Sequence, residues 1–294
     1  MKSINICVLG DDSITRFCKK GTKTDVTMYN RALEDKIITM IVPNIEKPQS
    51  IVFALQMCDF ILLSIKEINK NIGELILFAN EFNKKGKIII YDSYIEDDVK
   101  KMLHETKFEN FPILLNPKSL EEIIDGLEYE KHGEEKLVMV DQYFKVKSVG
   151  DVILGFIKSG SVKVFDKLIV YPSKKECIVK SIQVMSKNYK EASEPTRIGF
   201  SLKTDAELSR GVVLSNKEIK VVSELTGKFL KNKFYKKDLN GQIQAVIGLQ
   251  YVSASIENNK LKFLKPIVFE TFNNPILLID PNSFPRIAGR FDVL

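Results

Sequence analysis

The first residues that could do chemistry follow a short apolar run, Ile4–Leu9, which ends at Gly10. A phosphate-binding loop at such a place reads G-x-x-x-x-G-K-[ST], because glycines let backbone amides wrap a phosphate, a lysine reaches the outer phosphates and a hydroxyl holds magnesium. Here Thr15 replaces the second glycine, Arg16 the lysine and Phe17 the hydroxyl. Two aspartates after Gly10 also repel phosphate. We therefore predict an ordinary strand-to-helix connection and no nucleotide-binding residues.

A second candidate is the stretch Lys228–Lys237, which holds five lysines and three aromatic residues in ten positions. Such interleaving suits RNA, because lysines neutralise phosphates and an aromatic face stacks on an unpaired base. A barrel strand with aromatics inward and lysines outward is the other interpretation, and the two are compatible. The predicted RNA-binding residues are Lys228, Lys231, Lys233, Lys236 and Lys237, followed by Arg197, Arg286 and Arg290.

Other reaction chemistry has no support in the sequence. The two histidines, His104 and His132, have no second ligand at metal-binding spacing, so we predict surface residues and no metal site. The four cysteines are far apart and should be reduced. Neither a Gly-x-Gly-x-x-Gly after a strand nor a Gly-x-Ser-x-Gly elbow is present. We predict a protein that is not an enzyme and needs no cofactor.

Composition and charge favour a globular protein of two or three domains with an anionic partner. The 294 residues are 44% hydrophobic and 28% charged. The net charge is divided unevenly: residues 1–136 hold 19 Lys/Arg against 23 Asp/Glu, and residues 137–294 hold 25 against 15. The N-terminus lacks a leader pattern and no apolar run is long enough to span a membrane. We expect a cytoplasmic protein whose basic half meets a polyanion.

The elements that must position these residues differ between the two halves. Up to about residue 130, buried strand patterns alternate with helix patterns, which predicts an α/β domain. The clearest helix follows Ser119, with Glu122 completing a capping box. A polar linker, Lys131–Lys136, comes next. Short runs separated by turn residues then predict two β-barrels, with a boundary near Asn216. The predicted domains are 1–135, 136–217 and 218–294.

Four segments of the first barrel region carry a resemblance to a known family. Gly150–Leu168 resembles the start of the second domain of translational GTPases, and the matches continue in order through Val179–Val184, Arg197–Leu202 and Ser209–Leu214. Within that family, these segments most resemble the selenocysteine-specific elongation factor of archaea and eukaryotes, and still more the archaeal proteins described as similar to it. This resemblance implies a GTPase-like α/β domain followed by elongation factor Tu-like domains II and III. Glycine is usual in the family where Phe165 stands, so we expect that turn to be built differently.

Measured against that family, the nucleotide signatures are missing. Ile41–Glu46 lacks the aspartate and glycine expected after the second strand, and Tyr91–Glu96 stands where guanine selection needs Asn-Lys-x-Asp. Asn116-Pro117-Lys118 stands at the place where the family has the sequence Ser-Ala-Lys. A shortened segment between Gly10 and Lys36 resembles the family's switch sequence. Its residues Lys19, Lys20, Gly21 and Asp25 are interpreted either as a loop that contacts a partner or as a solvated turn.

Three functions follow from these observations. The leading hypothesis is a GTP-independent, elongation factor-like protein of translation, a monomer that binds tRNA or ribosomal RNA, or the ribosome, through its basic barrel half. The alternative that the resemblance implies is a working GTPase that delivers selenocysteinyl-tRNA. A third is a protein-interaction adaptor without RNA.

Overall fold

The computed structural model describes residues 2–239, 241–270 and 274–294, which form two compact units. The first unit holds the residues up to Tyr129 together with Asn232–Tyr235 and Asp280–Ala288. The second holds Glu130–Lys231, Lys236–Ile279 and Gly289–Leu294, within the described ranges. Two short segments of the C-terminal third therefore belong to the first unit.

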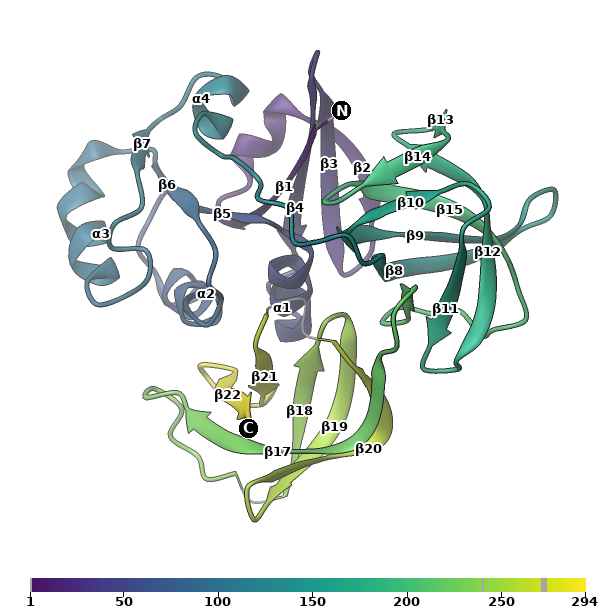
Figure 1. The fold of residues 1–294 in the computed structure, drawn as a ribbon. Coiled ribbons are helices and arrows are strands. Elements are labelled where there is room, and N and C mark those ends of the chain that lie inside the picture. The colour runs from purple at the N-terminus through teal and green to yellow at the C-terminus, as the bar shows by residue number, and fades with distance from the viewer. Residues whose placement is uncertain (1, 240, 271–273) are drawn as a thin grey trace. The chain divides into compact units, whose positions relative to one another are not determined.

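A seven-stranded sheet forms the centre of the first unit, in the order β2-β3-β4-β1-β5-β6-β7 (Figure 1). Its strands β1, β4, β5, β6 and β7 are parallel neighbours. The strands are β1 (Lys2–Gly10), β2 (Lys19–Lys23), β3 (Val26–Ala32), β4 (Lys36–Pro43), β5 (Phe60–Ile65), β6 (Gly86–Ile90) and β7 (Ile113–Leu115). The helices are η1 (Ser13–Phe17), α1 (Pro48–Met57), α2 (Lys70–Asn80), η2 (Ser93–Ile95), α3 (Glu96–Leu103) and α4 (Leu120–Ile124).

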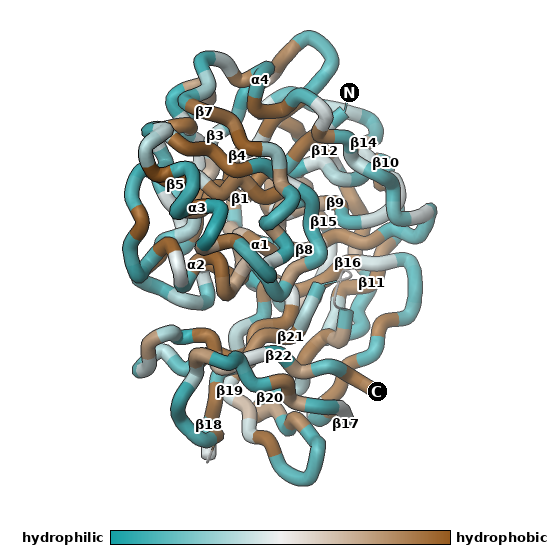
Figure 2. Tube along the Cα trace, turned by 90° about the vertical axis from the view of Figure 1, so that its left-hand side faces the viewer, coloured by the Kyte–Doolittle hydropathy of each residue, from teal (hydrophilic) through white to brown (hydrophobic). Residues whose placement is uncertain are grey.

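Both faces of this sheet are covered, which explains why its central strands are continuous apolar runs. Ile4, Ile6 and Val8 of β1 share one core with the apolar residues of α4. The alternate residues of β1 lie on the other face, where α1 packs on β1 and β4 and α2 packs on β1. Strands β1, β4 and β5 are accordingly among the most hydrophobic parts of the trace (Figure 2).

Local signals fix the helix ends, in part differently from the sequence prediction. Pro48 opens α1, in the first turn, where its missing amide hydrogen needs no partner. Helix α2 begins at Lys70, because the Asn69 side chain accepts hydrogen bonds from two amides of the first turn, and it ends at Asn80. Ser119 caps α4 by accepting from Glu122 N at 3.2 Å. Glu122 does not complete the capping box, since its carboxylate accepts from Lys118 N instead.

The segment after η1 corrects one prediction. Lys19, Lys20 and Gly21 lie on the edge strand β2, which pairs antiparallel with β3, and Asp25 lies in the turn between them. The expected loop is therefore a hairpin that extends the sheet. Strand β3 also pairs antiparallel with β4. In β3, Val26 and Met28 alternate with less buried residues, which is the pattern of a strand. The polar residues around them make this pattern hard to recognise in the sequence.

The second unit contains two closed six-stranded barrels. In the first, β11-β16-β8-β9-β15-β12 closes through pairing of β11 with β12. Its strands are β8 (Leu137–Val146), β9 (Gly150–Ser159), β11 (Lys167–Tyr171), β12 (Lys175–Val184), β15 (Arg197–Thr204) and β16 (Val213–Ser215). The short strands β10 (Ser161–Lys163) and β14 (Glu191–Ser193) form a ribbon, and β13 (Lys187–Tyr189) extends β12.

The second barrel is closed in the order β17-β20-β19-β18-β21-β22. Its strands are β17 (Lys220–Lys231), β18 (Gln242–Ile247), β19 (Gln250–Glu257), β20 (Lys260–Phe269), β21 (Ile276–Ile279) and β22 (Ile287–Val293). The predicted fold class, an α/β domain followed by two β-barrels, is confirmed. Within the described part of the chain, the helices are all too short or too polar to cross a membrane.

Phe165 corrects the expectation for the turn before β11. Its φ is 74°, the left-handed conformation that glycine adopts readily, and its side chain is 77% exposed. Phe165 N donates to Val179 O at 2.7 Å. The turn thus keeps a backbone conformation that favours glycine, although the residue is a bulky aromatic.

Candidate functional site

The connection after β1 is the place where a phosphate-binding loop would lie, and three of its backbone amides are already engaged. Asp11 N donates to Ser64 O at 2.9 Å and Thr15 N donates to Asp12 O at 2.9 Å. Ser13 N donates to the Asp11 carboxylate at 3.0 Å. A 3-10 helix of five residues follows in place of a long α-helix. These three amides are therefore satisfied within the protein and do not point to a phosphate.

Asp11 places a negative charge at the centre of this connection. Its Oδ2 atom forms an ion pair with Lys66 Nζ at 2.8 Å, and its other oxygen accepts from both the amide and the hydroxyl of Ser13. Burial alone raises the pKa of Asp11, but the hydrogen bonds from Lys66 and Ser13 outweigh it and hold the pKa below its usual value. The carboxylate is ionised at neutral pH and repels phosphate.

Gly10 and the three residues that replace the phosphate-binding motif have other roles. At Gly10, φ is 98° and an added Cβ would collide with the carbonyl of Ser64, so glycine is needed for the close approach of the chains. Thr15 is buried. The guanidinium of Arg16 lies 4.8 Å from the ring centroid of Phe17, and its Nη2 donates to Pro117 O at 3.4 Å. None of these contacts needs a nucleotide.

The turn after β4 is fixed by the hairpin that precedes it. Asn44 N donates to Asp25 O at 3.0 Å, and Ser50 Oγ donates to the same carbonyl at 2.6 Å. Lys47 Nζ forms an ion pair with the Asp25 carboxylate at 2.9 Å. Of the proposed partner residues, Asp25 is therefore occupied in holding this turn, whereas Lys19, Lys20 and Gly21 are exposed on β2.

The basic stretch is divided between β17 and the turn that follows it. Lys228, Lys231, Lys233, Lys236 and Lys237 are all exposed. Lys231 Nζ lies 3.6 Å from Asp238 Oδ1. Of the three aromatic residues, Phe234 is 49% exposed, while Tyr235 is buried and its hydroxyl donates to Asp280 at 3.1 Å. The stretch thus presents exposed lysines and one exposed ring, while Tyr235 packs inside the protein.

The three arginines are less suited to binding RNA than the lysines are. Burial lowers the pKa of Arg197, and the charge of Asp141 acts in the opposite direction. Arg290 Nε lies 3.0 Å from Asp292 Oδ1. Arg286 is engaged with Glu74, as described next. Each arginine therefore lies beside a carboxylate that competes with phosphate.

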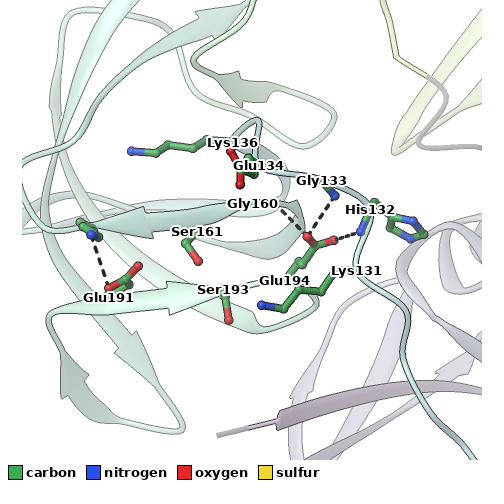
Figure 3. Close-up of a pocket in the computed structure, with 11 residues that line it drawn as sticks. Lys131, His132, Gly133, Glu134, Lys136, Gly160, Ser161, Glu191, Ser193 and Glu194 are labelled. Atoms are coloured by element: carbon green, nitrogen blue, oxygen red, sulfur yellow. Dashed lines mark hydrogen bonds and ion pairs between the residues drawn. The ribbon is translucent and has the colours of Figure 1, made fainter.

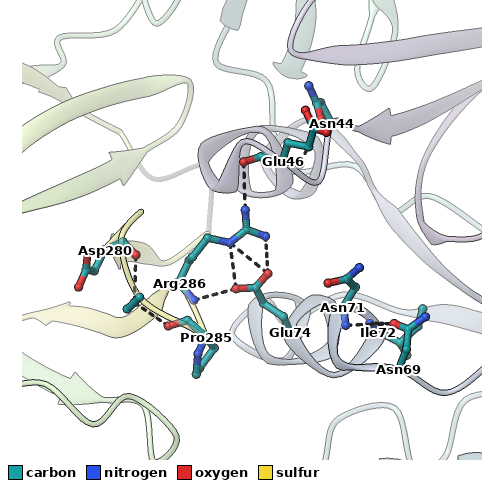
Figure 4. A network of polar contacts seen from close by, with 10 residues as sticks. Asn44, Glu46, Asn69, Asn71, Ile72, Glu74, Asp280, Pro285 and Arg286 are labelled. Atoms are coloured by element: carbon teal, nitrogen blue, oxygen red, sulfur yellow. Dashed lines mark hydrogen bonds and ion pairs between the residues drawn. The ribbon is translucent and has the colours of Figure 1, made fainter.

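Glu74 and Arg286 form a buried ion pair within the first unit (Figure 4). The carboxylate accepts from Arg286 N at 2.7 Å, from Nε at 3.1 Å and also from Nη2. Arg286 Nη1 donates to Glu46 O at 3.0 Å. Only 2% of the Glu74 side chain and 17% of the Arg286 side chain are exposed. The pair fixes the 280–288 segment on α2.

A second buried charge cluster lies in the first barrel. Asp141, whose side chain is 1% exposed, lies 3.3 Å from Arg210 Nη2, and Arg210 Nε donates to Asp141 O at 3.0 Å. Gln142 donates to the same carboxylate at 3.1 Å. Burial raises the pKa of Asp141 despite the nearby arginines. Neither this cluster nor the Glu74–Arg286 pair was predicted from the sequence, where the only signal for each was an acidic residue next to apolar ones.

Part of the predicted linker is anchored to the first barrel (Figure 3). The buried Glu194 carboxylate accepts from the backbone amides of His132 at 2.8 Å, Gly133 at 3.4 Å and Gly160 at 3.2 Å. The adjoining cavity, of about 650 Å³, has polar and charged walls of both signs. Lys136, one of its lysines, is paired with Asp166 at 2.6 Å. Because its walls carry both positive and negative charges, the cavity does not favour any one chemical class of ligand.

Metal ligation has no candidate in the part of the chain that the structure describes, since no three His, Cys, Asp or Glu side chains are grouped to hold an ion. His104 and His132 are exposed. Cys7, Cys58 and Cys177 are buried, and Cys18 is partly buried.

Known proteins similar to this chain agree with the fold. No protein-family model matches it. The "Uncharacterized protein MJ0325" of Methanocaldococcus jannaschii is 35% identical over 288 residues, 92% of each chain. The selenocysteine-specific elongation factor of the same organism is 31% identical over 164 residues, 52% of this chain and 35% of that factor. Elongation factor 1-alpha of Metallosphaera sedula is 28% identical over 51% of this chain and 34% of that protein. The chain thus spans about a third of these elongation factors.

Solved structures extend the likeness over the whole chain. The apo crystal structure of translation elongation factor SelB from Methanococcus maripaludis has a TM-score of 0.80 and 20% identity, with 100% of this chain and 79% of that one covered. The crystal structure of a bacterial selenocysteine-specific elongation factor has a TM-score of 0.81 and 17% identity, with 100% of this chain and 58% of that one covered. At these identities the likeness describes the fold.

Proposed function

The chain belongs to a family of proteins related to the selenocysteine-specific elongation factor, and from this premise we propose that it is a translation-factor-like protein that binds RNA without GTP. The proposal includes no GTP hydrolysis, so the protein is not an enzyme. The partner is a tRNA or a ribosomal RNA surface. The cytoplasmic location, the monomeric state and the three domain boundaries stay predictions.

The ion pair between Asp11 and Lys66 is the observation that carries the GTP-independent part. A phosphate at this connection would have to displace a carboxylate that holds two bonds from Ser13 and one from Lys66. It would then find the amides of Asp11 and Thr15 donating to backbone carbonyls. Removing these partners costs about 1 kcal/mol for each neutral bond and more for a charged one, before any phosphate contact forms.

Charge supports the RNA-binding part. Residues 137–294 carry ten more Lys/Arg than Asp/Glu, 25 against 15, and five exposed lysines of this excess lie between Lys228 and Lys237. Lysine contacts with phosphate release counterions, which gives most of the affinity of many RNA-binding proteins. The exposed ring of Phe234 adds a surface on which an unpaired base stacks.

Filter binding with tRNA and with ribosomes, in the presence and absence of GTP and magnesium, tests the function. We expect affinity that falls steeply with salt and does not depend on nucleotide. A genuine elongation factor serves as the positive control. If no association is found at moderate salt while the control binds, the RNA-binding function is wrong. A stable protein partner that survives nuclease treatment would support the adaptor hypothesis instead.

A further inference from the structure

A cavity of about 360 Å³ lies in the first unit, apart from the connection after β1. Its walls come from α2, from the end of α3 and the residues that follow it, and from the segments 232–235 and 280–288. Small-molecule sites commonly have volumes of about 300 to 1,000 Å³. The apolar part of the lining consists of Ile76, Leu77, Met102, Phe234, Phe284 and Pro285.

Two phenylalanine rings of this cavity are exposed, and each has a lysine above it. Phe234 is 49% exposed, and Lys233 Nζ lies 5.2 Å from its centroid. Phe284 is 54% exposed, and Lys70 Nζ lies 5.5 Å from its centroid. Such distances allow a cation–π attraction. Among the described residues, neither lysine lies within ion-pair distance of a carboxylate, in contrast to Lys231.

The charged residues that line the cavity give it a slight net positive charge, because the lysines exceed the unpaired acidic residues. Glu74 lines it, but its carboxylate is bound by Arg286, and the pair is shown in Figure 4. Glu105 is the other acid, and it is exposed. Lys70 and Lys233 therefore outnumber the one carboxylate whose charge is not already paired. A ligand with an aromatic plane and a negative charge meets complementary groups here.

We propose that this cavity binds an unpaired nucleotide of an RNA, with the base stacked on Phe284 or Phe234 and the adjacent phosphates beside Lys70 and Lys233. The inference rests on the proposed RNA-binding function. Bases that are splayed out of a helix stack on aromatic side chains, and lysines alongside neutralise the backbone. An apolar protein side chain would fill the same space but would desolvate the two ammonium groups without a partner.

Fluorescence anisotropy with two RNAs tests the proposal. One is a blunt-ended duplex, and the other is the same duplex with a short unpaired extension. We expect the wild type to bind the extended RNA on the order of tenfold more tightly, since stacking a base on a side chain has effects of about five- to 150-fold. Phe284→Ala together with Phe234→Ala should abolish this preference and leave affinity for the blunt duplex within about twofold, because lysine contacts with phosphate dominate there.

Three further variants separate stacking from loss of folding. Phe284→Leu retains apolar bulk without an aromatic face, and it should lose most of any preference that Phe284 supplies. Tyr94→Ala removes another exposed aromatic side chain of the first unit, 93% exposed and outside the cavity, and it should retain the full preference. Lys70→Met should lower the salt slope for the extended RNA by about 0.7, the contribution of one phosphate contact on a single strand.

The outcomes distinguish this inference from the function on which it rests. Equal wild-type affinity for the two RNAs would overturn the nucleotide site while leaving RNA binding in place. A preference that persists in the double alanine variant would also overturn it, and would place the unpaired bases elsewhere. Failure to bind either RNA would remove the proposed function itself. Thermal melting of each variant shows whether a loss reflects unfolding.

Discussion

Lys66 Nζ lies 2.8 Å from Asp11 Oδ2, so the first connection of the chain is held together by an internal ion pair. The Tyr91 ring lies 5.3 Å from the same ammonium group, and the Tyr91 hydroxyl is 3.1 Å from both Ser13 Oγ and Ser64 Oγ. These contacts join the ends of β1, β5 and β6. A carboxylate and its partners thereby stabilise the edge of the sheet at which a related GTPase would bind phosphate.

The Asp11 ion pair predicts a pH-dependent contribution to stability. Because the hydrogen bonds from Lys66 and Ser13 lower the pKa of Asp11 in the folded protein, the ionised carboxylate stabilises the fold above the unfolded pKa of about 3.9, and the effect is lost as the pH falls through the lower folded-state pKa. Asp11→Asn should lower the free energy of unfolding by about 1 kcal/mol at pH 7. Urea unfolding at several pH values measures this, and the difference between the two proteins should shrink as the pH falls through the lowered pKa of Asp11. A constant difference would mean that the charge has no role.

Phe165 predicts an unusual stabilising substitution. Left-handed backbone costs an L-residue about 1 to 2 kcal/mol, and the ring is 77% exposed, so little packing is lost when it is removed. Phe165→Gly should raise the free energy of unfolding by about 0.5 to 1 kcal/mol after the greater entropy of unfolded glycine is included. Phe165→Ala is the matched control and should bring no such gain. A loss of stability in the glycine variant would indicate that the ring packs against something.

The Glu74–Arg286 pair predicts strong coupling between two distant positions in the chain. Removing one member leaves the other charge buried, so Glu74→Leu or Arg286→Met should each lower the free energy of unfolding by about 3 kcal/mol. The double variant should lose much less than the sum, because apolar residues of similar size replace the pair. A double-mutant cycle measured by chemical denaturation gives the coupling. Additive losses would contradict a direct interaction.

The lysines of the basic stretch predict the salt dependence of RNA binding. Replacing Lys231, Lys233, Lys236 and Lys237 by alanine should reduce the slope of log K against log salt by about 3, at about 0.7 to 0.9 for each phosphate contact. Filter binding over a range of salt concentrations gives the slope. The control is Lys100→Ala with Lys101→Ala on α3, where both lysines are ion-paired and the slope should not change. An unaltered slope in the quadruple variant would move the RNA surface elsewhere.

Much of the fold could be predicted from the sequence because apolar periodicity and turn residues are local signals. The parallel strands β1, β4, β5 and β6 are continuous apolar runs, and Pro48 and Ser119 mark helix starts. Strand β2 could not be predicted, since an exposed edge of lysines has no such period. Glycine was not needed at the turn before β11, because the chain tolerates Phe165 in a left-handed conformation.

The candidate site was less predictable, because its contacts join residues that are far apart in the chain. The absence of a phosphate-binding pattern could be read directly from Thr15, Arg16 and Phe17. The partner of Asp11, Lys66, lies 55 positions later, and Arg286 lies 212 positions after Glu74. No local pattern specifies such pairs. Likewise, the burial of Tyr235 against Asp280 depends on the tertiary fold, and the composition of the basic stretch did not show it.

The central claim is that the chain works without guanine nucleotide, and calorimetry with GTP and GDP in the presence of magnesium tests it most directly. A ligand shifts a conformational equilibrium only through a difference in affinity between the states, so without nucleotide binding neither structure nor RNA affinity should respond to GTP. We predict no saturable heat at nucleotide concentrations up to about 1 mM, which corresponds to a binding free energy weaker than about −4 kcal/mol. Stoichiometric binding with micromolar affinity would contradict the account and restore a working GTPase.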